Sequence, residues 1–303
     1  MPDRVLLDAA LARIAEALDS TGAYRVTRRF RPRQRYADAD GTPTLRALFV
    51  DAETTGLDTA TDAIIQLAVV PFEYAPSDGR IFAVDPPWVR LEDPGRPIPP
   101  EVTALTGISD ADVAGRRIDD AAVRTVAAGA SLVIAHNAGF DRPLVERRLP
   151  WFRELPWACS CAEVPWARHG IASAKLDYLL YRHCQEFFDG HRADEDALAG
   201  VHALATPFGD GTLPMAVLLE SSRRPTVRLW AIDAAFEFKA ALKSRGYRWS
   251  SGEDGRTRAW YRDLREEDAD AECAWLNAHV YRGRGGRWRK HVFGALDRYS
   301  DRV

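Results

Sequence analysis

The sequence predicts a mixed α/β sheet flanked by helices, followed by a small α+β domain. Three apolar runs come first, and alternating helical and apolar segments follow them, which is the order expected of a mixed sheet with helices on its faces. After a stretch rich in proline, glycine and serine, the pattern of strands and helices starts again. A chain of 303 residues is long enough for one medium domain and one small one.

An N-terminal extension precedes the predicted sheet. Residues 3–19 repeat apolar side chains at helical spacing, which predicts an amphipathic helix. Residues 24–36 are rich in arginine and alternate in polarity, so we expect an edge strand there. A loop at 38–44, which contains glycine and proline, leads into the sheet.

The first three strands of the sheet are expected to form an antiparallel meander. The apolar residues 48–50 indicate a buried strand, and a Thr-Thr-Gly turn at 54–56 ends it. Two further apolar runs of strand character follow, at residues 64–72 and 81–90. A proline-rich loop at 94–100 then leads to short acidic helices.

The remaining elements alternate. A short buried strand is expected at 132–135, among helices at 119–130, 140–149, 176–184 and 194–205. Beyond them we expect strands at 226–232, 247–250 and 258–264 and helices at 214–219, 233–244 and 266–281. The chain is therefore divided into an extension at 1–44, a main domain at 45–206, a linker at 207–225 and an accessory domain at 226–303.

Composition indicates a soluble globular protein of the cytoplasm. Hydrophobic residues make up 46% and charged residues 28% of the chain. No apolar run reaches the roughly 18 residues that a membrane helix needs, and the N-terminus lacks a signal-peptide layout. The four cysteines do not have zinc-site spacing, so we expect reduced thiols.

Charge is unevenly distributed along the chain. Residues 223–303 contain 18 Lys and Arg against 12 Asp and Glu, whereas the remainder contains 23 against 32. An acidic body with a basic appendage suits a polyanionic substrate that one part holds and the other processes.

Two acids, Asp51 and Glu53, stand one residue apart at the end of the first predicted strand. Because side chains alternate along a strand, both carboxylates point to the same face. Neighbouring carboxylates repel each other unless a cation lies between them, and oxygen-only ligands suit Mg²⁺ or Mn²⁺. For this triplet alone, a solvated Asp-x-Glu at a turn is the alternative.

Two further acids and a histidine have a similar context. Asp141 lies in the first turn of a helix that follows a buried strand, beside the end of the sheet. Asp196 lies near the start of the helix at 194–205, with His191 five residues before it. This spacing lets the imidazole reach over a metal site that Asp196 helps to form.

Three segments together resemble the exonuclease motifs of the DnaQ-like 3′→5′ exonucleases, in the DEDDh subgroup that has a histidine in its third motif. They are VDAETTGL at 50–57, AHNAGFD at 135–141 and HRADEDA at 191–197. The loop at 97–108 also resembles the family's linker after the third strand. The resemblance covers about residues 45–206 and implies a ribonuclease-H-like fold with a mixed five-stranded sheet.

The resemblance also implies roles for single residues. Two divalent cations, Mg²⁺ or Mn²⁺, would be bound by four acids, with His191 as the general base; the acids are Asp51, Glu53, Asp141 and Asp196. The chemistry agrees, because two cations about 4 Å apart activate a water and stabilise the leaving oxygen. A histidine that titrates near neutral pH suits removal of the proton from that water.

Substrate contacts carry over in the same way, to Thr54, Thr55, Leu57, His136, Asn137 and Phe140. Core packing is the favoured alternative for Phe140, and ordering of the turn before Asp141 is the favoured alternative for His136 and Asn137. The sequence departs from the family at Gln66, where relatives often carry glutamate.

A basic run near the C-terminus is a second candidate for nucleic-acid contact; its residues are Arg282, Arg284, Arg287, Trp288, Arg289 and Lys290. Arginines interleaved with aromatic residues suit single strands, through phosphate contacts and base stacking. The alternative is a small domain that uses its tryptophans as core and has a basic tail.

The expected function is two-metal 3′→5′ exonuclease activity that releases nucleoside 5′-monophosphates, with DNA favoured over RNA and single-stranded 3′ ends as substrate. A proofreading subunit bound to a polymerase and an RNA-trimming or oligoribonuclease-type enzyme are alternatives. An inactive nucleic-acid-binding adaptor is the non-enzyme alternative, although all four acids and the histidine are present. A polymerase or a second copy of the chain would be the protein partner.

Overall fold

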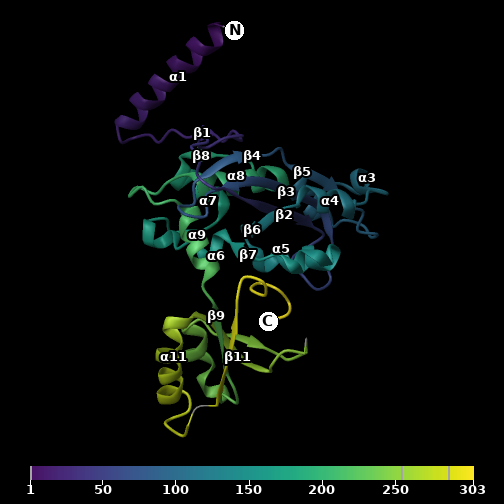
Figure 1. Ribbon diagram of the computed structural model, residues 1–303, viewed down its shortest axis with the longest axis vertical. Helices are drawn as coiled ribbons and strands as arrows, with labels where there is room; N and C mark the ends of the chain where they lie inside the picture. Colours follow the sequence, from purple (N-terminus) through teal and green to yellow (C-terminus); the bar gives the residue numbers. More distant parts are fainter. Residues whose placement is uncertain (1, 254, 286) are drawn as a thin grey trace.

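The computed structural model describes residues 2–253, 255–285 and 287–303, and places two sheets one above the other along its long axis (Figure 1). In the described part of the chain, no helix is both long and apolar enough to cross a membrane.

The larger sheet has the predicted mixed topology. Its strands are β2 (Leu45–Thr54), β3 (Ile64–Tyr74), β4 (Ile81–Val84), β5 (Trp88–Leu91), β6 (Ala130–Ala135) and β7 (Trp157–Cys159). The order is β4-β3-β2-β6-β7, with β5 also paired to β3. The strand expected at 81–90 is divided into β4 and β5, which both pair antiparallel with β3, so that six strands occupy the sheet in place of five.

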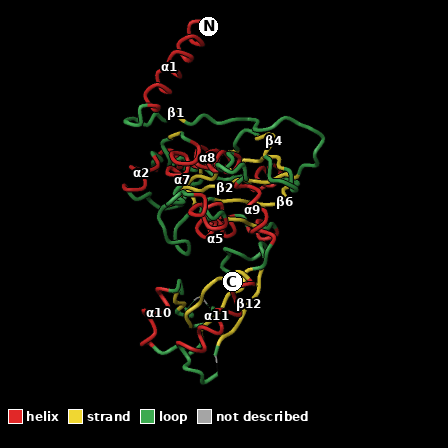
Figure 2. Tube along the Cα trace, turned by 90° about the vertical axis from the view of Figure 1, so that its left-hand side faces the viewer, coloured by secondary structure: helices red, strands yellow, loops and turns green. Residues whose placement is uncertain are grey.

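Helices cover both faces of this sheet (Figures 1 and 2). They are α2 (Pro100–Thr106), α3 (Asp110–Val113), α4 (Asp120–Val126), α5 (Ala138–Arg148), α6 (Ser160–Glu163), α7 (Leu176–Leu179), α8 (Ala193–Ala205) and α9 (Pro214–Arg223). The helix expected at 176–184 ends as a π-helical turn, Leu180–Cys184. Short 3₁₀ turns, Pro150–Glu154 and Trp166–His169, complete this domain.

The side chains of β2 alternate between two cores. Phe49 packs in the core that includes α8, whereas Leu48 and Val50 pack in the core that includes α4 and α5. Asp51 and Glu53 continue the register of Phe49, so strand alternation directs both acids to the α8 side of the sheet.

Residues 207–225, the expected linker, contain α9. Its Met215, Leu218 and Leu219 are buried in the same core as α8. The segment therefore contains a helix that packs in the core of the larger domain. The exact domain boundaries stay a prediction.

The N-terminal extension contains the predicted helix, α1 (Pro2–Ser20), which projects away from the sheet in two perpendicular views (Figures 1 and 2). Two short pairings replace the edge strand expected at 24–36. Strand β1 (Arg28–Arg29) pairs in parallel with β8 (Glu186–Phe187), and Arg35 bridges to Ala83.

The smaller sheet is antiparallel, in the order β10-β11-β9-β12. Its strands are β9 (Thr226–Ala231), β10 (Arg248–Ser250), β11 (Ala259–Arg265) and β12 (Trp288–Phe293), with helices α10 (Lys239–Ser244) and α11 (Glu266–His279). The helix expected at 233–244 is shorter, because a 3₁₀ turn, Phe236–Phe238, precedes α10. Strand β12 was not expected and includes part of the basic run.

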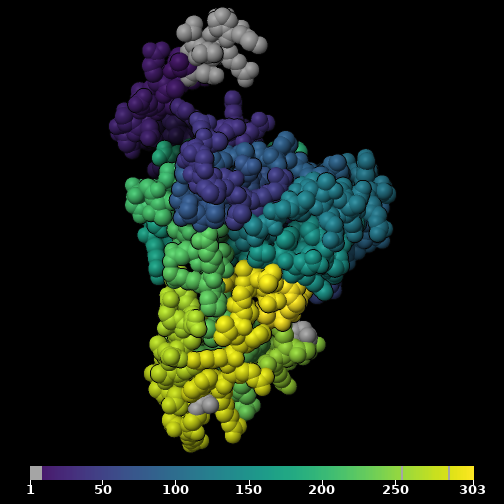
Figure 3. Space-filling view, in the orientation of Figure 1, coloured from purple at the N-terminus to yellow at the C-terminus, as the bar shows by residue number. Residues whose placement is uncertain are grey.

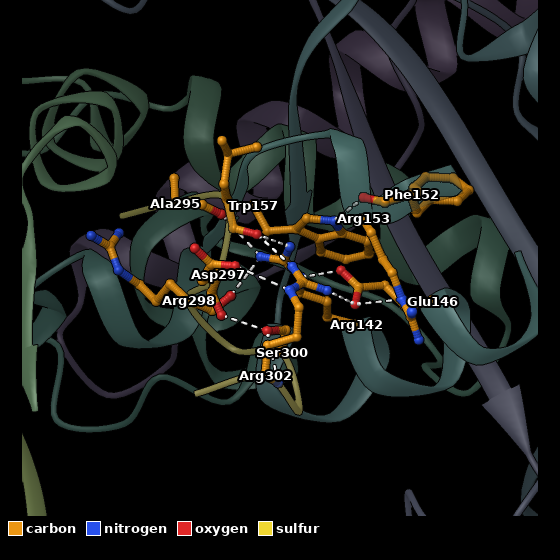
Figure 4. A network of polar contacts seen from close by, with 11 residues as sticks. Arg142, Glu146, Phe152, Arg153, Trp157, Ala295, Asp297, Arg298, Ser300 and Arg302 are labelled. Atoms are coloured by element: carbon orange, nitrogen blue, oxygen red, sulfur yellow. Dashed lines mark hydrogen bonds and ion pairs between the residues drawn. The ribbon is translucent and has the colours of Figure 1, made fainter. Parts of the chain in front are cut away.

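The last ten residues, 294–303, which we call the tail, return to the larger domain (Figure 3). Arg142 of α5 is fully buried and donates hydrogen bonds to three tail carbonyls, at Ala295 (2.9 Å), Arg298 (2.7 Å) and Leu296. Glu146, one turn further along α5, accepts a hydrogen bond from Nη1 of Arg302 at 2.6 Å. Figure 4 shows these groups converging, so the tail ties the two sheets together.

Candidate active site

Three carboxylates come together between β2 and α8. Asp51, Glu53 and Asp196 are half-buried, and each offers an oxygen that lies within 4.8 Å of the oxygens of the other two. This arrangement confirms that the two acids of β2 share a face, and it shows that this face looks toward the start of α8. Oxygen ligands at this spacing fit a divalent cation.

Close packing brings Asp196 to the sheet. At Gly200 a Cβ atom would lie 2.1 Å from the Phe49 ring, so only glycine allows α8 to approach β2 this closely. At the start of the helix, the backbone N–H of Ala193 donates to Oε1 of Gln66 at 3.1 Å. The amide of Gln66, the departure noted in the sequence, therefore anchors the end of the helix that carries Asp196.

Asp141 is almost completely buried in the first turn of α5, where its backbone N–H donates to the carbonyl of Asn137 at 3.2 Å. Burial, followed by the charge of Glu53, raises the pKa of Asp141 to about 8. Asp141 is not one of the three clustered carboxylates, but its charge also raises the pKa of Asp51. It therefore lies within electrostatic reach of the cluster.

The other acids also have raised pKa values. For Asp51, burial comes first among the causes, and the charges of the other acids add to it. Burial and the charge of Asp196 raise the pKa of Glu53 to about 7. Burial raises the pKa of Asp196 itself to about 6, although backbone hydrogen bonds from Arg192 and His191 oppose the shift.

Among the described residues, no lysine or arginine lies within ion-pair distance of these four acids. Like charges in a half-buried site without a basic partner are unfavourable unless a cation neutralises them. The donor set is therefore chemically suited to hard divalent metal ions.

His191 lies on the exposed loop before α8. Its backbone has a positive φ of 73°, an uncommon conformation for a residue other than glycine. Its charge acts on Asp196, which places the imidazole near the carboxylate cluster. The imidazole makes no hydrogen bond to another residue in the described ranges, so it is available to a water or a substrate.

The predicted substrate residues after Glu53 have different environments. Thr54 and Thr55 are buried, and their hydroxyls donate within the loop, to the carbonyl of Gly56 at 2.6 Å and to Oδ1 of Asp62 at 2.8 Å. Leu57 is 88% exposed, and its contact with a base stays a prediction.

The residues before Asp141 are partly structural. His136 bonds through Nδ1 to Ser160 (2.9 Å) and through Nε2 to the carbonyl of Ala174 (2.7 Å), and burial lowers its pKa. Phe140 packs against the core beside α5. Asn137 is exposed at the N-cap of α5, and its side chain makes no capping bond.

The basic run at 282–290 lies in the smaller domain. Three of its side chains form ion pairs, Arg282 with Glu237 (2.7 Å), Arg287 with Asp233 (3.1 Å) and Lys290 with Asp270 (2.6 Å). Trp288 packs against the core of this domain, whereas Arg284 and Arg289 are exposed.

Sequence reasoning missed the group that shapes the loop after Thr55. Arg96 donates to the Thr55 hydroxyl (2.6 Å) and to Asp62 (2.8 Å). Gly56 leaves room for Asp62, whose Oδ2 would be 2.5 Å from a Cβ at that position. The glycine in the motif was the available signal, because it marks a place where no side chain fits.

Curated relatives match parts of the chain. A DNA polymerase III subunit epsilon-like protein of Rhodobacter capsulatus is 41% identical over 118 residues, which are 35% of this chain and 15% of the relative. A PolC-type DNA polymerase III of Clostridium perfringens is 30% identical over 163 residues, 52% of this chain and 11% of the relative. The chain thus spans only a small part of the length of these relatives.

Solved structures with similar folds include Exonuclease X in complex with 5′-overhanging duplex DNA, at 23% identity and a TM-score of 0.38, covering 58% of this chain and 90% of that one. Another is an E. coli ExoI–single-stranded DNA complex, at 15% identity and a TM-score of 0.47, covering 75% and 67%. The RNase T exonuclease family matches residues 48–204, just over half of the sequence. The chain therefore belongs to this family of DnaQ-like exonucleases within the ribonuclease-H-like superfamily.

Proposed function

We propose that the protein is a metal-dependent 3′→5′ exonuclease that releases nucleoside 5′-monophosphates from single-stranded 3′ ends, with DNA preferred to RNA. The observation that carries the proposal is the cluster of Asp51, Glu53 and Asp196, without a basic partner in the described ranges, inside an exonuclease domain.

Two Mg²⁺ or Mn²⁺ ions are the proposed cofactors, held by Asp51, Glu53, Asp141 and Asp196. When bound, such ions supply Lewis acidity for phosphodiester hydrolysis. The chain provides these acids on three elements, β2, α5 and α8, so the ligand oxygens are positioned before binding.

His191 is the proposed general base. It lies on an exposed loop close to Asp196, and its positive charge lowers the pKa of that carboxyl group. A histidine in this position can accept the proton of the attacking water and pass it to solvent.

The loop after Glu53 supports the 3′-end assignment. Leu57 is exposed on the loop that follows Glu53, where an apolar side chain can pack on the last base, and the buried Thr54 and Thr55 hold the loop in place. The proposed substrate surface also includes the exposed Asn137 and the basic run at 282–290, whereas His136 and Phe140 support that surface from within the fold. Ion pairs of that run with surface acids are exposed and exchange readily for phosphate contacts.

A polymerase-bound proofreading role is the second candidate. It is favoured by the relatives, which are an epsilon-like subunit of DNA polymerase III and a PolC-type polymerase. Association with a purified replicative polymerase would distinguish it from a free enzyme, whose active form would be the single chain or a homodimer.

The direct test uses single strands of DNA and RNA of one sequence, labelled at either end, with Mg²⁺, Mn²⁺ or EDTA. We expect a 3′ label to be released at once as mononucleotide and a 5′ label to give a descending ladder. Release of the 5′ label first would reverse the assigned direction, and RNA cleaved faster than DNA would reverse the substrate preference. Absence of metal-dependent cleavage from every strand would falsify the enzymatic proposal.

His191→Asn tests the general base. We expect its rate to fall by about 10²- to 10⁴-fold while Mn²⁺ binding is retained. An unchanged rate would remove His191 from the mechanism.

A further inference from the structure

A cleft of about 560 Å³ lies between the two sheets. On one side are Thr59, Gly139 and Pro143 of the exonuclease domain, and on the other is the smaller sheet. The tail, from Arg298 to Val303, lines the cleft between them.

The smaller sheet forms one wall of the cleft with the face that points away from α11. Leu229 and Leu264 pack in the core with α11, so strand alternation turns Arg228 and Tyr261 to the other face. Arg228 is buried there, with its guanidinium 4.6 Å from the ring centre of Tyr261. Packing therefore holds Arg228 against Tyr261 in this wall.

The wall is basic and open to an anionic ligand. Asp263 is shared by Arg228 (2.6 Å) and Arg248 (3.2 Å), so one acid serves two arginines. The Arg248 side chain is 64% exposed. The Arg265 side chain is 46% exposed and lies 3.5 Å from Glu267. An exposed ion pair of this kind contributes little to stability, so Arg265 can exchange it for a phosphate.

The cleft lies at the same edge of the large sheet as the carboxylates. Strands β2, β6 and β7 are parallel neighbours, and adjacent strands in a sheet lie about 5 Å apart. The residues that follow their carboxyl ends therefore lie side by side. Gly139 follows β6, and Glu163 of the cleft follows β7. The loop with the exposed Leu57 also contributes Thr59 to the cleft, which links the two places directly.

We propose that this cleft binds the phosphate backbone of the single strand on the 5′ side of the terminal nucleotide, with Arg248 and Arg265 as its phosphate contacts. This inference rests on the proposed exonuclease function, because the strand must lead from the acids into the cleft. Tyr261, half-exposed beside Arg248, is placed to contact a sugar or a base.

The test is binding of a fluorescent single strand of about 16 nucleotides to the full chain in EDTA, where no cleavage occurs. For the double variant Arg248→Gln/Arg265→Gln we expect about tenfold weaker binding at moderate salt. We also expect the slope of log K against log salt to be about 1.4 smaller in magnitude, since each phosphate contact on a single strand contributes about 0.7. The matched control is Arg116→Gln/Arg117→Gln, two exposed arginines outside the cleft, which should retain wild-type affinity and slope.

A second measurement separates failure of this inference from failure of the proposed function. The ratio of kcat/KM for the strand to kcat/KM for thymidine 5′-monophosphate p-nitrophenyl ester should fall about tenfold in the double variant. Wild-type affinity and slope in the Arg248→Gln/Arg265→Gln variant, or an equal loss in the control Arg116→Gln/Arg117→Gln, would overturn the cleft assignment. If wild type binds the strand through the cleft but cleaves neither substrate, the exonuclease proposal fails alone.

Discussion

Two groups of buried acids lie on the same domain and differ in their partners. Glu146 of α5 meets Arg142 and Arg302, both at 2.6 Å, and Glu163 meets Arg298 at 2.8 Å. The acids around Asp51 have no lysine or arginine side chain within ion-pair distance among the described residues. The first group joins the tail to the body (Figure 4), whereas the second lies at an open edge of the sheet.

The difference indicates which buried charges are structural. A buried carboxylate with an arginine partner is neutralised by the fold itself, and removing either partner leaves an uncompensated charge. A buried carboxylate without such a partner is neutralised by protonation or by a bound cation. Opposite responses to neutralising substitutions should therefore separate the two groups.

Asp51→Asn should have the largest effect on activity. We expect a loss of about 10⁴-fold in kcat/KM, or about 5 kcal/mol in activation free energy, because a ligand and a charge are removed together. In EDTA the same variant should melt at a higher temperature than wild type, since repulsion among the acids is relieved. Calorimetry and the end-labelled assay measure the two effects, and a lower melting temperature in EDTA would contradict the comparison.

Glu146→Gln should have the reverse pattern. It leaves Arg142 buried with one charge partner fewer, and we expect a loss of about 4 kcal/mol in the free energy of unfolding. Urea unfolding measures this loss, and the folded fraction should keep its metal-dependent activity. The control is Glu237→Gln, which breaks an exposed pair with Arg282 and should change stability by less than about 0.5 kcal/mol.

Gly200→Ala tests how the acid of α8 reaches the cluster. Its Cβ would lie 2.1 Å from the buried Phe49 ring, so the helix must shift, at a cost of about 3 kcal/mol in stability. The shift should also weaken Mn²⁺ binding by displacing Asp196. Thermal melting with and without Mn²⁺ measures both effects. Partial recovery in Gly200→Ala/Phe49→Leu is expected, and Mn²⁺ affinity equal to wild type in the single variant would contradict the argument.

The stability of the metal-free protein should depend on pH with a defined sign. The pKa values of Asp196, Glu53 and Asp141 are raised to about 6, 7 and 8, so the folded state binds more protons than the unfolded state between pH 4 and 8. Stability in EDTA should therefore fall as pH rises through this range, by on the order of several kcal/mol between pH 5 and 8. Melting curves of wild type and Asp51→Asn measure the effect, and equal slopes would contradict it.

The order of the elements and the acids of the site could be predicted because both depend on local patterns. Alternation on β2 placed Asp51 and Glu53 on one face, and a strand followed by a small-residue turn placed Asp141 at a helix start. The contact between Gly200 and Phe49 could not be predicted, because it joins residues 151 positions apart. Its local signal was only a glycine inside a helix.

The C-terminal part was harder for the same reason. Strand β12 mixes basic and apolar residues on both faces, so residues 288–290 were read as part of a basic run. Arg142 follows Asp141 in sequence, and no local pattern marks it as a buried residue. Its burial depends on tail carbonyls more than 150 residues away.

Titration of the metal-free protein with Mn²⁺ at pH 7 most directly tests the claim that the unpaired acids form a cation site. Calorimetry in two buffers of different ionisation enthalpy reports both binding and proton release. The account predicts that wild type binds Mn²⁺ with release of protons, because acids with raised pKa values must ionise, and that Asp51→Asn loses most of this binding. Equal Mn²⁺ binding by the two proteins, or binding without proton release, would contradict it.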